Sequence, residues 1–506
     1  MEGQRPPAPR RTGRRAFLRT GVLVAGAGLA LPLLQACSSS PVTPAPPVSG
    51  PAPSKPAEPA KPAEASKPAA APAQSSGKPG DIKLTAWFTD RRSINDMTEK
   101  EAVPEFQSKN PGITVEIQFV PEAQIQQKLL AARAANNAPD LTAIDETFED
   151  TLWKNKALVA IPPSVMDVRQ EMGAKVADLY KLPPGQAQGE YFGLPNGTFG
   201  AALYYNTDLL KELNYTPEQI PDKWDDFIKW AKDVTKWNGN TLERTGFTIF
   251  GSDAGLLREY RTQKGGWQDG NIYPAKDQVK LTRDLEYEVT QWVLDFYDVH
   301  KLDARDGVTY QEKFGTGRAV TTLAYTWNNG FIETQYKMNN YGIKLPPHPN
   351  PADKSLPRGE ASPDVGFCVT TQSTNPAQVE ASWKLWRYLV GPDYLKRYCV
   401  LRGVQPSLKS MWTMPEFSTD KGGPKWGALA EKVKPGNYLD MGFISIELNT
   451  ILARSWPQIR DEKADPKQVL AAVEKDANEY LKANPQWSIL SAEDYKAHPE
   501  WLKPEG

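Results

Sequence analysis

The sequence is poor in cysteine and histidine. Of its 506 residues only three are Cys, at positions 37, 368 and 399, and only three are His, at 300, 348 and 498. Three thiols exclude a disulfide-stapled scaffold and a Cys-rich metal cluster. The histidines lie far apart, so the paired-His spacings of zinc enzymes are absent. We therefore expect no metal site and no cofactor.

The sequence also lacks the common signatures of catalysis and nucleotide binding. In Gly251-Ser252-Asp253-Ala254-Gly255 the serine stands one position too early for a nucleophile elbow. No phosphate-binding loop of the G-x-x-x-x-G-K-[ST] type occurs, and Gly315-Thr316-Gly317 lacks the third glycine of a dinucleotide fingerprint. Acidic pairs such as Asp145-Glu146 could serve a glycoside hydrolase, in which two carboxyl groups flank the bond. That hypothesis stays open as the enzymatic alternative.

There is no excess of positive charge to attract nucleic acid. The formal net charge is −1, but residues 1–80 hold ten Lys and Arg against three Asp and Glu, and residues 81–506 hold 50 against 58. Nucleic-acid affinity depends largely on Lys and Arg meeting phosphates, so the acidic second part argues against such a partner. All 15 tryptophans lie in that second part. They suit stacking surfaces as well as cores.

The N-terminal residues follow the order of an export signal. Arg14-Arg15 precedes an uncharged stretch over 20–36, which is short for a membrane-spanning helix and ends at Cys37. The arginine pair resembles a twin-arginine signal, and Leu34-Gln35-Ala36-Cys37 resembles a bacterial lipobox. We predict a signal peptide over 1–36 and a lipid on Cys37 that holds the exported protein at the periplasmic or extracellular face of the cell membrane. The alternative is a buried apolar helix with a chance cysteine.

Residues 38–80 contain 12 prolines, much alanine and two copies of Ser-Lys-Pro-Ala. This composition cannot form a core and favours extended polyproline II. With Cys37 it reads as a disordered tether over 37–80. A weakly basic segment that touches anionic lipid or wall polymer is the alternative interpretation.

From Asp81 onward, strand and helix patterns alternate. Apolar residues alternate with polar ones over 82–87 and 113–119, and a helical stripe follows over 122–136, before a third strand over 139–145. A second block begins near 201, with an amphipathic helix over 222–237 and strands over 246–250, 318–327 and 364–371. Helices are expected over 376–389, 444–459 and 466–482. The order predicts two α/β lobes, each a mostly parallel sheet flanked by helices, with a ligand at the carboxyl ends of strands.

Several motifs together resemble a known family. They are Pro139-Asp140-Leu141-Thr142-Ala143-Ile144-Asp145, Gly193-Leu194-Pro195, the run from Ala202 to Leu210, Gly265-Gly266-Trp267, the run from Gly317 to Gly330, and Ser373-Thr374-Asn375-Pro376-Ala377. In order and spacing they resemble the extracellular solute-binding proteins of ABC importers, in particular the carbohydrate-uptake branch that includes maltodextrin-binding proteins. The resemblance covers roughly residues 81–485. It implies a type II periplasmic-binding fold whose two lobes close on a sugar and present it to the permease.

By position within that fold, lobe one is expected at 81–195 plus 345–403 and lobe two at 196–344 plus 404–506. The resemblance implies ligand contacts at strand ends of both lobes. The candidate contacts are Trp87, Asp145, Glu146, Trp267, Trp327, Asn328, Asn196, Ser252, Asp253 and Arg402. Aromatic rings stack on the apolar faces of sugars, and carboxylates accept bonds from their hydroxyl groups. Each of these residues has a plain alternative as core or loop packing.

Other aromatic and thiol groups are expected in the interior. Tryptophans on helical stripes are predicted to pack in cores: Trp224, Trp230, Trp292, Trp383 and Trp386. Cys368 and Cys399 are expected as buried free thiols, with a disulfide as the alternative. The resulting hypothesis is a monomeric, lipid-anchored sugar receptor that catalyses nothing. Its rivals are an exported enzyme acting on polysaccharide and a receptor for a peptide, a polyamine or an organic anion.

Overall fold

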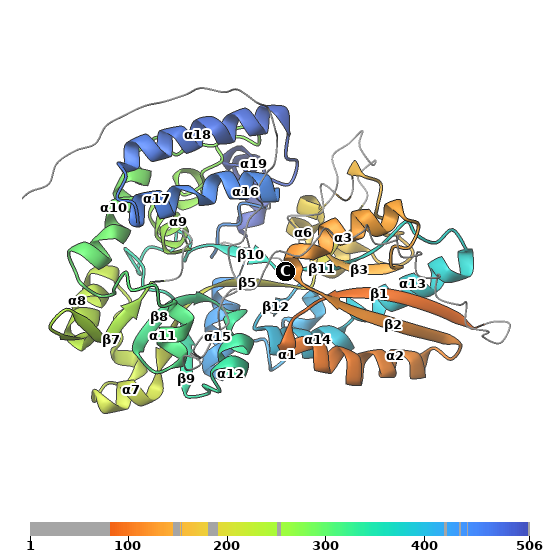
Figure 1. The fold of residues 1–506 in the computed structure, drawn as a ribbon, viewed down its shortest axis with the longest axis horizontal. Coiled ribbons are helices and arrows are strands. Elements are labelled where there is room, and N and C mark those ends of the chain that lie inside the picture. The colour runs from red at the N-terminus through yellow and green to blue at the C-terminus, as the bar shows by residue number, and fades with distance from the viewer. Residues whose placement is uncertain are drawn as a thin grey trace, which may run out of the picture. The chain divides into compact units, whose positions relative to one another are not determined.

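The computed structural model describes residues 81–144, 152, 154–180, 191–249, 255–418, 423–434, 437–442 and 444–503, all within the unit Ser75–Gly506. These residues form two sheets, each covered by helices (Figure 1). The predicted signal peptide, Cys37 and the tether lie outside the described residues.

The first sheet has the strand order β2-β1-β3-β11-β4. Its strands are β1 Ile82–Thr89, β2 Ile113–Val120, β3 Leu141–Ile144, β4 Leu194–Pro195 and β11 Gly366–Val369. β1 pairs in parallel with β2 and β3, whereas β11 runs antiparallel to β3 and β4. The predicted β-α-β-α-β order from β1 to β3 is therefore confirmed. The antiparallel strand β11 comes from a segment more than 200 residues later.

Helices cover both faces of the first sheet. They are α1 Arg92–Met97, a π-helical turn Thr98–Ala102, α2 Val103–Lys109, α3 Glu122–Ala134, α5 Val168–Met172, α6 Ala174–Tyr180, α13 Pro376–Leu389 and α14 Pro392–Arg402. In the view of Figure 1, α3 lies above β1 and β2, and α2 lies below them. Pro376 and Pro392 each stand in the first turn of a helix, where the missing amide hydrogen costs nothing.

The second sheet has the order β10-β5-β8-β7-β6, and β9 and β12 also pair with β5. Its strands are β5 Gly197–Asn206, β6 Lys236–Asn238, β7 Thr241–Thr248, β8 Ala319–Tyr325, β9 Tyr341–Lys344, β10 Ala361–Pro363 and β12 Gln405–Pro406. Its helices are α7 Thr207–Glu212, α8 Trp224–Val234, α9 Gly255–Asp269, α10 Asp284–Asp298, α11 Tyr310–Gly315, α12 Asn328–Gln335, α15 Gly423–Lys432, α16 Ile446–Ala453, α17 Ser455–Arg460, α18 Pro466–Ala483 and α19 Ala492–Ala497.

The prediction that both sheets are mostly parallel is wrong for the second one. Only β7 and β8 pair in parallel, and β5 is antiparallel to β8, β9, β10 and β12. β5 is ten residues long and carries the chain out of the first sheet. β9, β10 and β12 pair antiparallel with β5. An antiparallel pair needs no crossover helix, so strands from later parts of the chain can add to β5 in this direction.

Among the described residues, three segments of the chain lead from one sheet to the other, and we call them the crossing segments: residues 195–197 between β4 and β5, residues 363–366 between β10 and β11, and residues 403–407 around β12. Backbone hydrogen bonds join them, from Asp364 N to Gly197 O (2.7 Å), from Asn196 N to Val365 O (3.2 Å) and from Ser407 N to Asn196 O (3.2 Å). The three crossing segments are therefore bonded to one another where the chain leaves one sheet for the other.

Each sheet has its own hydrophobic core. The first gathers buried residues of β1, β3, β11, α13 and α14, and the second those of β5, β8, α8 and α10. Val404, Met411 and Phe417, which follow α14, pack into the first core, as does Tyr495 of α19, whereas Leu448 of α16 and Val473 of α18 pack into the second. In Figure 1, α16 and α18 accordingly lie above the second sheet.

The predicted interior aromatic residues and thiols lie where the helical stripes indicated. Trp224, Trp230, Trp383 and Trp386 are buried, and Trp292 is partly buried and stacks on Tyr260 with ring centroids 3.6 Å apart. Cys368 and Cys399 are both buried, and no disulfide joins them. Burial raises the pKa of the Cys399 thiol well above its ordinary value, which keeps it protonated and unreactive.

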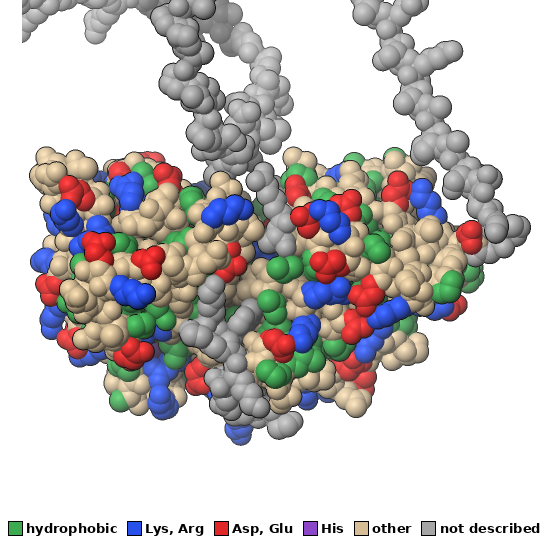
Figure 2. Space-filling model, turned by 90° about the horizontal axis from the view of Figure 1, so that it is seen from below, with side chains coloured by type: hydrophobic (Ala, Val, Ile, Leu, Met, Phe, Trp, Pro, Cys, Tyr) green, Lys and Arg blue, Asp and Glu red, His purple; other side chains and the backbone are tan. Residues whose placement is uncertain are grey.

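On the face shown in Figure 2, acidic and basic side chains are interspersed over both halves of the unit. Exposed ion pairs elsewhere in the unit include Lys83 with Glu116 at 2.8 Å and Lys100 with Asp96 at 2.8 Å. A surface of this kind presents no broad basic field on that face to a polyanion.

Candidate functional site

A cavity of about 370 Å³ lies between the second sheet and the helices α9, α10, α16 and α17, and we call it the cleft cavity. β5 contributes Phe199, β8 contributes Tyr325, and Trp327 stands at the N-cap position of α12. The other walls come from α9, α10, β10, the segment around Met441 and the helices α16 and α17. Its volume is within the roughly 300–1,000 Å³ typical of small-molecule sites.

Aromatic rings form one wall of the cleft cavity. Phe199 and Tyr325 meet edge to face, with ring centroids 5.3 Å apart and planes at 70°. Trp327 follows Tyr325 by two residues and is half-buried, which leaves part of the indole available. Flat apolar faces beside polar edges suit a ligand that has C–H faces and a hydroxyl rim.

The charged groups of the cavity are matched within the protein. Glu360 is buried and pairs with Arg258, at 3.1 Å between Oε1 and Nε, and the Tyr325 hydroxyl donates to the same carboxylate. Glu286 pairs with Arg261 at 2.8 Å. Because each of these carboxylates is paired with a guanidinium group, neither pair carries a net charge. The two pairs still present polar atoms to the cavity. Such a lining favours a neutral polar ligand over an ion.

An ion cluster connects the crossing segments to Trp327. Asp364 is fully buried between β10 and β11 and accepts from Arg402 Nη2 (3.2 Å), from Arg91 Nη1 (3.5 Å) and from the Tyr398 hydroxyl (2.6 Å). The two guanidinium groups hold the pKa of Asp364 below its ordinary value in spite of burial, which acts in the opposite sense. The Arg402 guanidinium also lies over the Trp327 ring, 5.3 Å from its centroid. Arg402 therefore positions Trp327 relative to the crossing.

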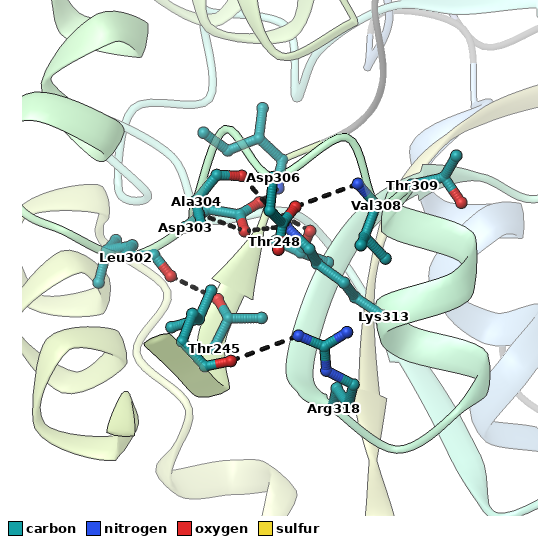
Figure 3. Close-up of polar contacts among 12 residues, drawn as sticks. Thr245, Thr248, Leu302, Asp303, Ala304, Asp306, Val308, Thr309, Lys313 and Arg318 are labelled. Carbon is teal, nitrogen blue, oxygen red and sulfur yellow. Dashed lines mark hydrogen bonds and ion pairs between the residues drawn. The ribbon is translucent and has the colours of Figure 1, made fainter. Parts of the chain in front are cut away.

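A second ion cluster fixes the carboxyl end of β7, as Figure 3 shows. Asp303 accepts from the Thr248 hydroxyl (2.8 Å), from Ile249 N (3.1 Å) and from Lys313 Nζ (2.7 Å). Lys313, which is also buried, pairs with Asp306 at 2.8 Å. The cluster ties the end of β7 to α11 directly before residues 250–254. The predicted contacts Ser252 and Asp253 belong to that segment and lie outside the described residues.

Of the other predicted contacts, Trp327 alone lines the cleft cavity. Trp87 is buried in the first core, where the Lys128 ammonium lies 4.5 Å from its ring centroid. Trp267 packs near Tyr495, with ring centroids 5.8 Å apart. Arg402 touches Trp327 but does not line the cavity. Asp145 and Glu146 lie outside the described residues.

The two predicted asparagines have structural positions. Asn328 is fully buried, and its amide oxygen accepts from the Tyr310 hydroxyl (3.0 Å) and from Gln311 Nε2 (2.9 Å). Its amide nitrogen donates to Tyr325 O at 3.0 Å, so its bonding capacity is largely used within the fold. Asn196 is also buried, in the first crossing segment, and its side-chain atoms have no partner among the described residues.

The lining residues that the sequence did not suggest include those of the aromatic wall and the ion pair described above: Phe199, Arg258, Tyr325 and Glu360. Phe199 and Tyr325 are in strands, where an aromatic residue reads as core, and Arg258 and Glu360 are about 100 residues apart in sequence. For Tyr325 the sequence did offer one indication, because it lies two residues before the predicted contact Trp327 in the motif-bearing run from Gly317 to Gly330.

Within the described ranges, no group of three or more His, Cys, Asp and Glu side chains is placed to hold a metal ion. Over the same part of the chain, no helix combines the length and the apolar character needed to cross a bilayer.

Comparison with known proteins gives distant but extensive matches. The lactose-binding protein of Rhizobium radiobacter is 26% identical over 197 residues, which is 38% of this chain and 44% of that protein, so the match spans less than half of that relative. The arabinooligosaccharide-binding protein of Bacillus subtilis is 23% identical over 356 residues, covering 68% of this chain and 77% of that protein.

Among solved structures, the GacH receptor of Streptomyces glaucescens, determined unliganded and with acarbose, superimposes with a TM-score of 0.64 at 17% identity, over 79% of this chain and 99% of that one. This likeness establishes the two-lobed fold. The family described as bacterial extracellular solute-binding protein matches residues 101–425, which is more than half of the chain. The chain therefore belongs to the bacterial extracellular solute-binding protein family.

Proposed function

We propose that this protein captures a sugar or an oligosaccharide between two closing lobes and delivers it to the permease of an ABC importer. One observation carries the proposal: the cleft cavity combines an aromatic wall with internally matched charges, Arg258 with Glu360 and Arg261 with Glu286. Both relatives compared above are named for sugars that they bind, lactose and arabino-oligosaccharide. A neutral, hydroxyl-rich ligand is what such a lining selects.

The lobes that close are taken as 81–195 plus 345–403 and 196–344 plus 404–506. A ligand that touches both lobes shifts the population toward the closed state. The crossing segments are suited to this motion, because hinges absorb closure in a few residues between rigid bodies. The first-lobe half of the site includes Asp145 and Glu146 in this proposal, and the second-lobe half is built on Trp327.

We further propose that the protein is a receptor and not an enzyme, that it acts as a monomer and that it needs no cofactor. The two relatives are binding proteins rather than enzymes. A glycoside hydrolase needs one carboxyl group free to donate a proton and a second free to act as base or nucleophile. In the cleft cavity Glu360 and Glu286 are each paired with an arginine, which opposes that use.

Export follows from membership of an extracellular family. The anchor is proposed as a lipid on Cys37, with 38–80 as the tether that lets the receptor reach the permease. Conversion of Cys37 to Ser should move the protein from the membrane fraction to the soluble exported fraction. A Cys37→Ser protein that stays with the membrane would contradict the lipid anchor and leave the sugar site unaffected.

Titration calorimetry with purified residues 81–506 tests the sugar assignment. Lactose, maltotriose and an arabino-oligosaccharide cover the sizes that the relatives suggest. Trp327→Ala should weaken binding by roughly 1–2 kcal/mol, about 5–30-fold, because it removes an aromatic anchor. Phe331→Ala is the matched control, since Phe331 is on the same helix, is 40% exposed and does not line the cavity. Binding of a peptide or a polyamine without any sugar would overturn the ligand class and keep the receptor.

A further inference from the structure

A second cavity, of about 450 Å³, lies on the opposite face of β5 from the cleft cavity. Side chains alternate along a strand, so Phe199, which lines the cleft cavity, and Thr198, which lines the second one, point to opposite faces. Gln405 of β12 pairs in register with Thr198 and lines the same second cavity. Ser407, two residues further along, lines it too. We call this space the hinge cavity.

The hinge cavity has walls from both halves of the fold. Met172, Lys175 and Val176 come from α5 and α6, whose apolar residues belong to the first core. Ala430 and Val433 come from α15 and the residue after it, and α15 packs against β5 and β9 of the second sheet. The cavity therefore spans the crossing segments, and its dimensions depend on how the two halves are arranged.

Two buried polar atoms face the hinge cavity without a partner among the described residues. They are Oγ of Ser407, a residue 5% exposed, and Oε1 of Gln405, a residue 7% exposed. The Gln405 amide orientation is fixed, because its Nε2 donates to Phe417 O at 2.9 Å. A buried polar atom without a partner costs about 1–3 kcal/mol, so these two atoms favour an occupant that supplies hydrogen bonds.

Aromatic side chains supply the apolar part of the lining. They are Trp412, Phe417, Tyr438 and Trp501. The Trp412 indole is held in place by a bond from its Nε1 to Pro406 O at 2.9 Å. A ring held at the edge of a cavity that also contains unsatisfied polar atoms suits a molecule with a flat apolar face and several hydroxyl groups.

The charges around the hinge cavity have protein partners. Lys175 lies 3.7 Å from Asp440 and 4.1 Å from the centroid of the Tyr438 ring, and Lys434 pairs with Glu431 at 2.7 Å. An anion would have to displace these partners, and a cation would meet lysines. The lining thus favours a neutral occupant.

We propose that the hinge cavity is a second ligand site, which takes a small neutral cyclic polyol through Ser407, Gln405 and Trp412. This site is distinct from the cleft cavity. Because its walls come from both halves, its occupancy and lobe closure are linked, so the bound polyol changes the affinity of the cleft for its solute. Linkage is reciprocal, and the cleft solute changes the affinity for the polyol by the same factor. The linkage rests on the proposed receptor function, whereas the binding of the polyol does not.

The test uses the full chain and myo-inositol as the probe, with titration calorimetry and saturation-transfer NMR as readouts. The unmodified protein should bind one myo-inositol. Val433→Trp should weaken that binding at least 10-fold by filling the cavity, and Ser407→Ala should weaken it about 3–10-fold, on the scale of one buried hydrogen bond. Val299→Trp is the control, since Val299 is 59% exposed and lines neither cavity. Trp327→Ala should leave myo-inositol binding unchanged.

Each outcome decides between the two sites. Absence of binding, or binding that survives both Val433→Trp and Ser407→Ala, overturns the hinge site. Loss on Trp327→Ala assigns the probe to the cleft and also overturns it. If Val433→Trp fails to fold by circular dichroism, Ser407→Ala with Thr198→Val replaces it. A protein that binds myo-inositol in the hinge cavity but no sugar in the cleft would keep the second site and contradict the proposed function.

Discussion

Asp364 and Glu259 are both fully buried acids beside the crossing segments, yet their pKa values move in opposite directions. Asp364 meets two guanidinium groups, of Arg402 and Arg91, together with the Tyr398 hydroxyl, and its pKa is held below the ordinary value. Glu259 meets a single cation, with Lys432 Nζ at 2.6 Å, and burial raises its pKa to about 7. The difference shows that the number of partners, and not depth, decides whether a buried acid keeps its charge.

The neighbours of Glu259 add to the contrast. Its carboxylate accepts from Glu360 N at 3.0 Å, but the Glu360 side chain places a second negative charge nearby and raises the pKa further. Lys432 is itself buried, so desolvation lowers its pKa. The Glu259–Lys432 pair therefore loses its charges more easily than the Asp364 cluster, in which the lowered pKa keeps Asp364 ionised.

The largest expected effect comes from Asp364→Asn. The substitution leaves Arg91 and Arg402 buried beside a neutral group, so we expect a loss of about 3–5 kcal/mol in the free energy of unfolding. Urea denaturation followed by circular dichroism measures it. The control is Glu122→Gln, which removes the 48%-exposed partner of Arg91 and should cost less than about 1 kcal/mol. Equal losses of unfolding free energy for Asp364→Asn and Glu122→Gln would contradict the larger effect expected for the buried acid.

Next comes Lys432→Met, which removes the cation that pairs with Glu259. At pH 8 we expect a loss of about 2–3 kcal/mol, because the unpaired Glu259 must either stay buried and charged or take up a proton. At pH 5.5, below the pKa of about 7 that Glu259 has in the intact protein, protonation is easier and the loss should be smaller. Urea unfolding at the two pH values measures the difference.

A double variant separates charge from packing at this pair. Glu259→Leu combined with Lys432→Met removes both charges and retains apolar volume, and its stability should approach that of the unmodified protein. A double variant as unstable as Lys432→Met alone would mean that the hydrogen bonds from Lys432 to Ala201 O and from Glu360 N to Glu259 matter more than the charges.

Much of the fold was predictable, because strand and helix periodicity are local properties. β1, β2, α3, α13 and α18 lie within a few residues of their expected bounds. The antiparallel pairing of β5 was not, since three of its partners follow it by more than 130 residues. For the same reason Asp364 was not foreseen, because Arg91 precedes it by 273 residues and the cluster forms only in the tertiary fold.

The candidate site was predictable to a smaller extent. Trp327 was predicted because it ends an expected strand in a motif-bearing run; it lines the cleft cavity, and its contact with a ligand stays a prediction. Trp87 fitted the same rule, but its side chain packs in the first core beside Lys128. A strand-end position specifies an edge of the sheet, whereas the face toward which a side chain points depends on register and on the helix that covers it.

Asp364 and Glu259 should also affect the pH dependence of stability in opposite ways. An acid whose pKa is lowered on folding contributes stability above its unfolded pKa, here the ordinary 3.8 of Asp364, and that contribution fades as pH falls through the folded value. An acid with a raised pKa has the opposite effect, so the Glu259 contribution declines as pH rises from 4.5 toward 7. The stability gap between the unmodified protein and Asp364→Asn should therefore narrow below pH 3.8 in acid titrations at fixed urea.

The smallest effect is expected at the cluster in Figure 3, which inverts the Asp364 arrangement by giving one buried cation two acids. Asp306→Asn leaves Lys313 with Asp303 at 2.7 Å, and Asp306 is 29% exposed, so the loss should be about 0.5–1 kcal/mol. Asp303→Asn is the stringent partner, because Asp303 also accepts from Thr248 and Ile249. Urea unfolding measures both losses. A larger loss of unfolding free energy for Asp306→Asn than for Asp303→Asn would contradict the expectation that the buried charge with the most hydrogen bonds contributes most to stability.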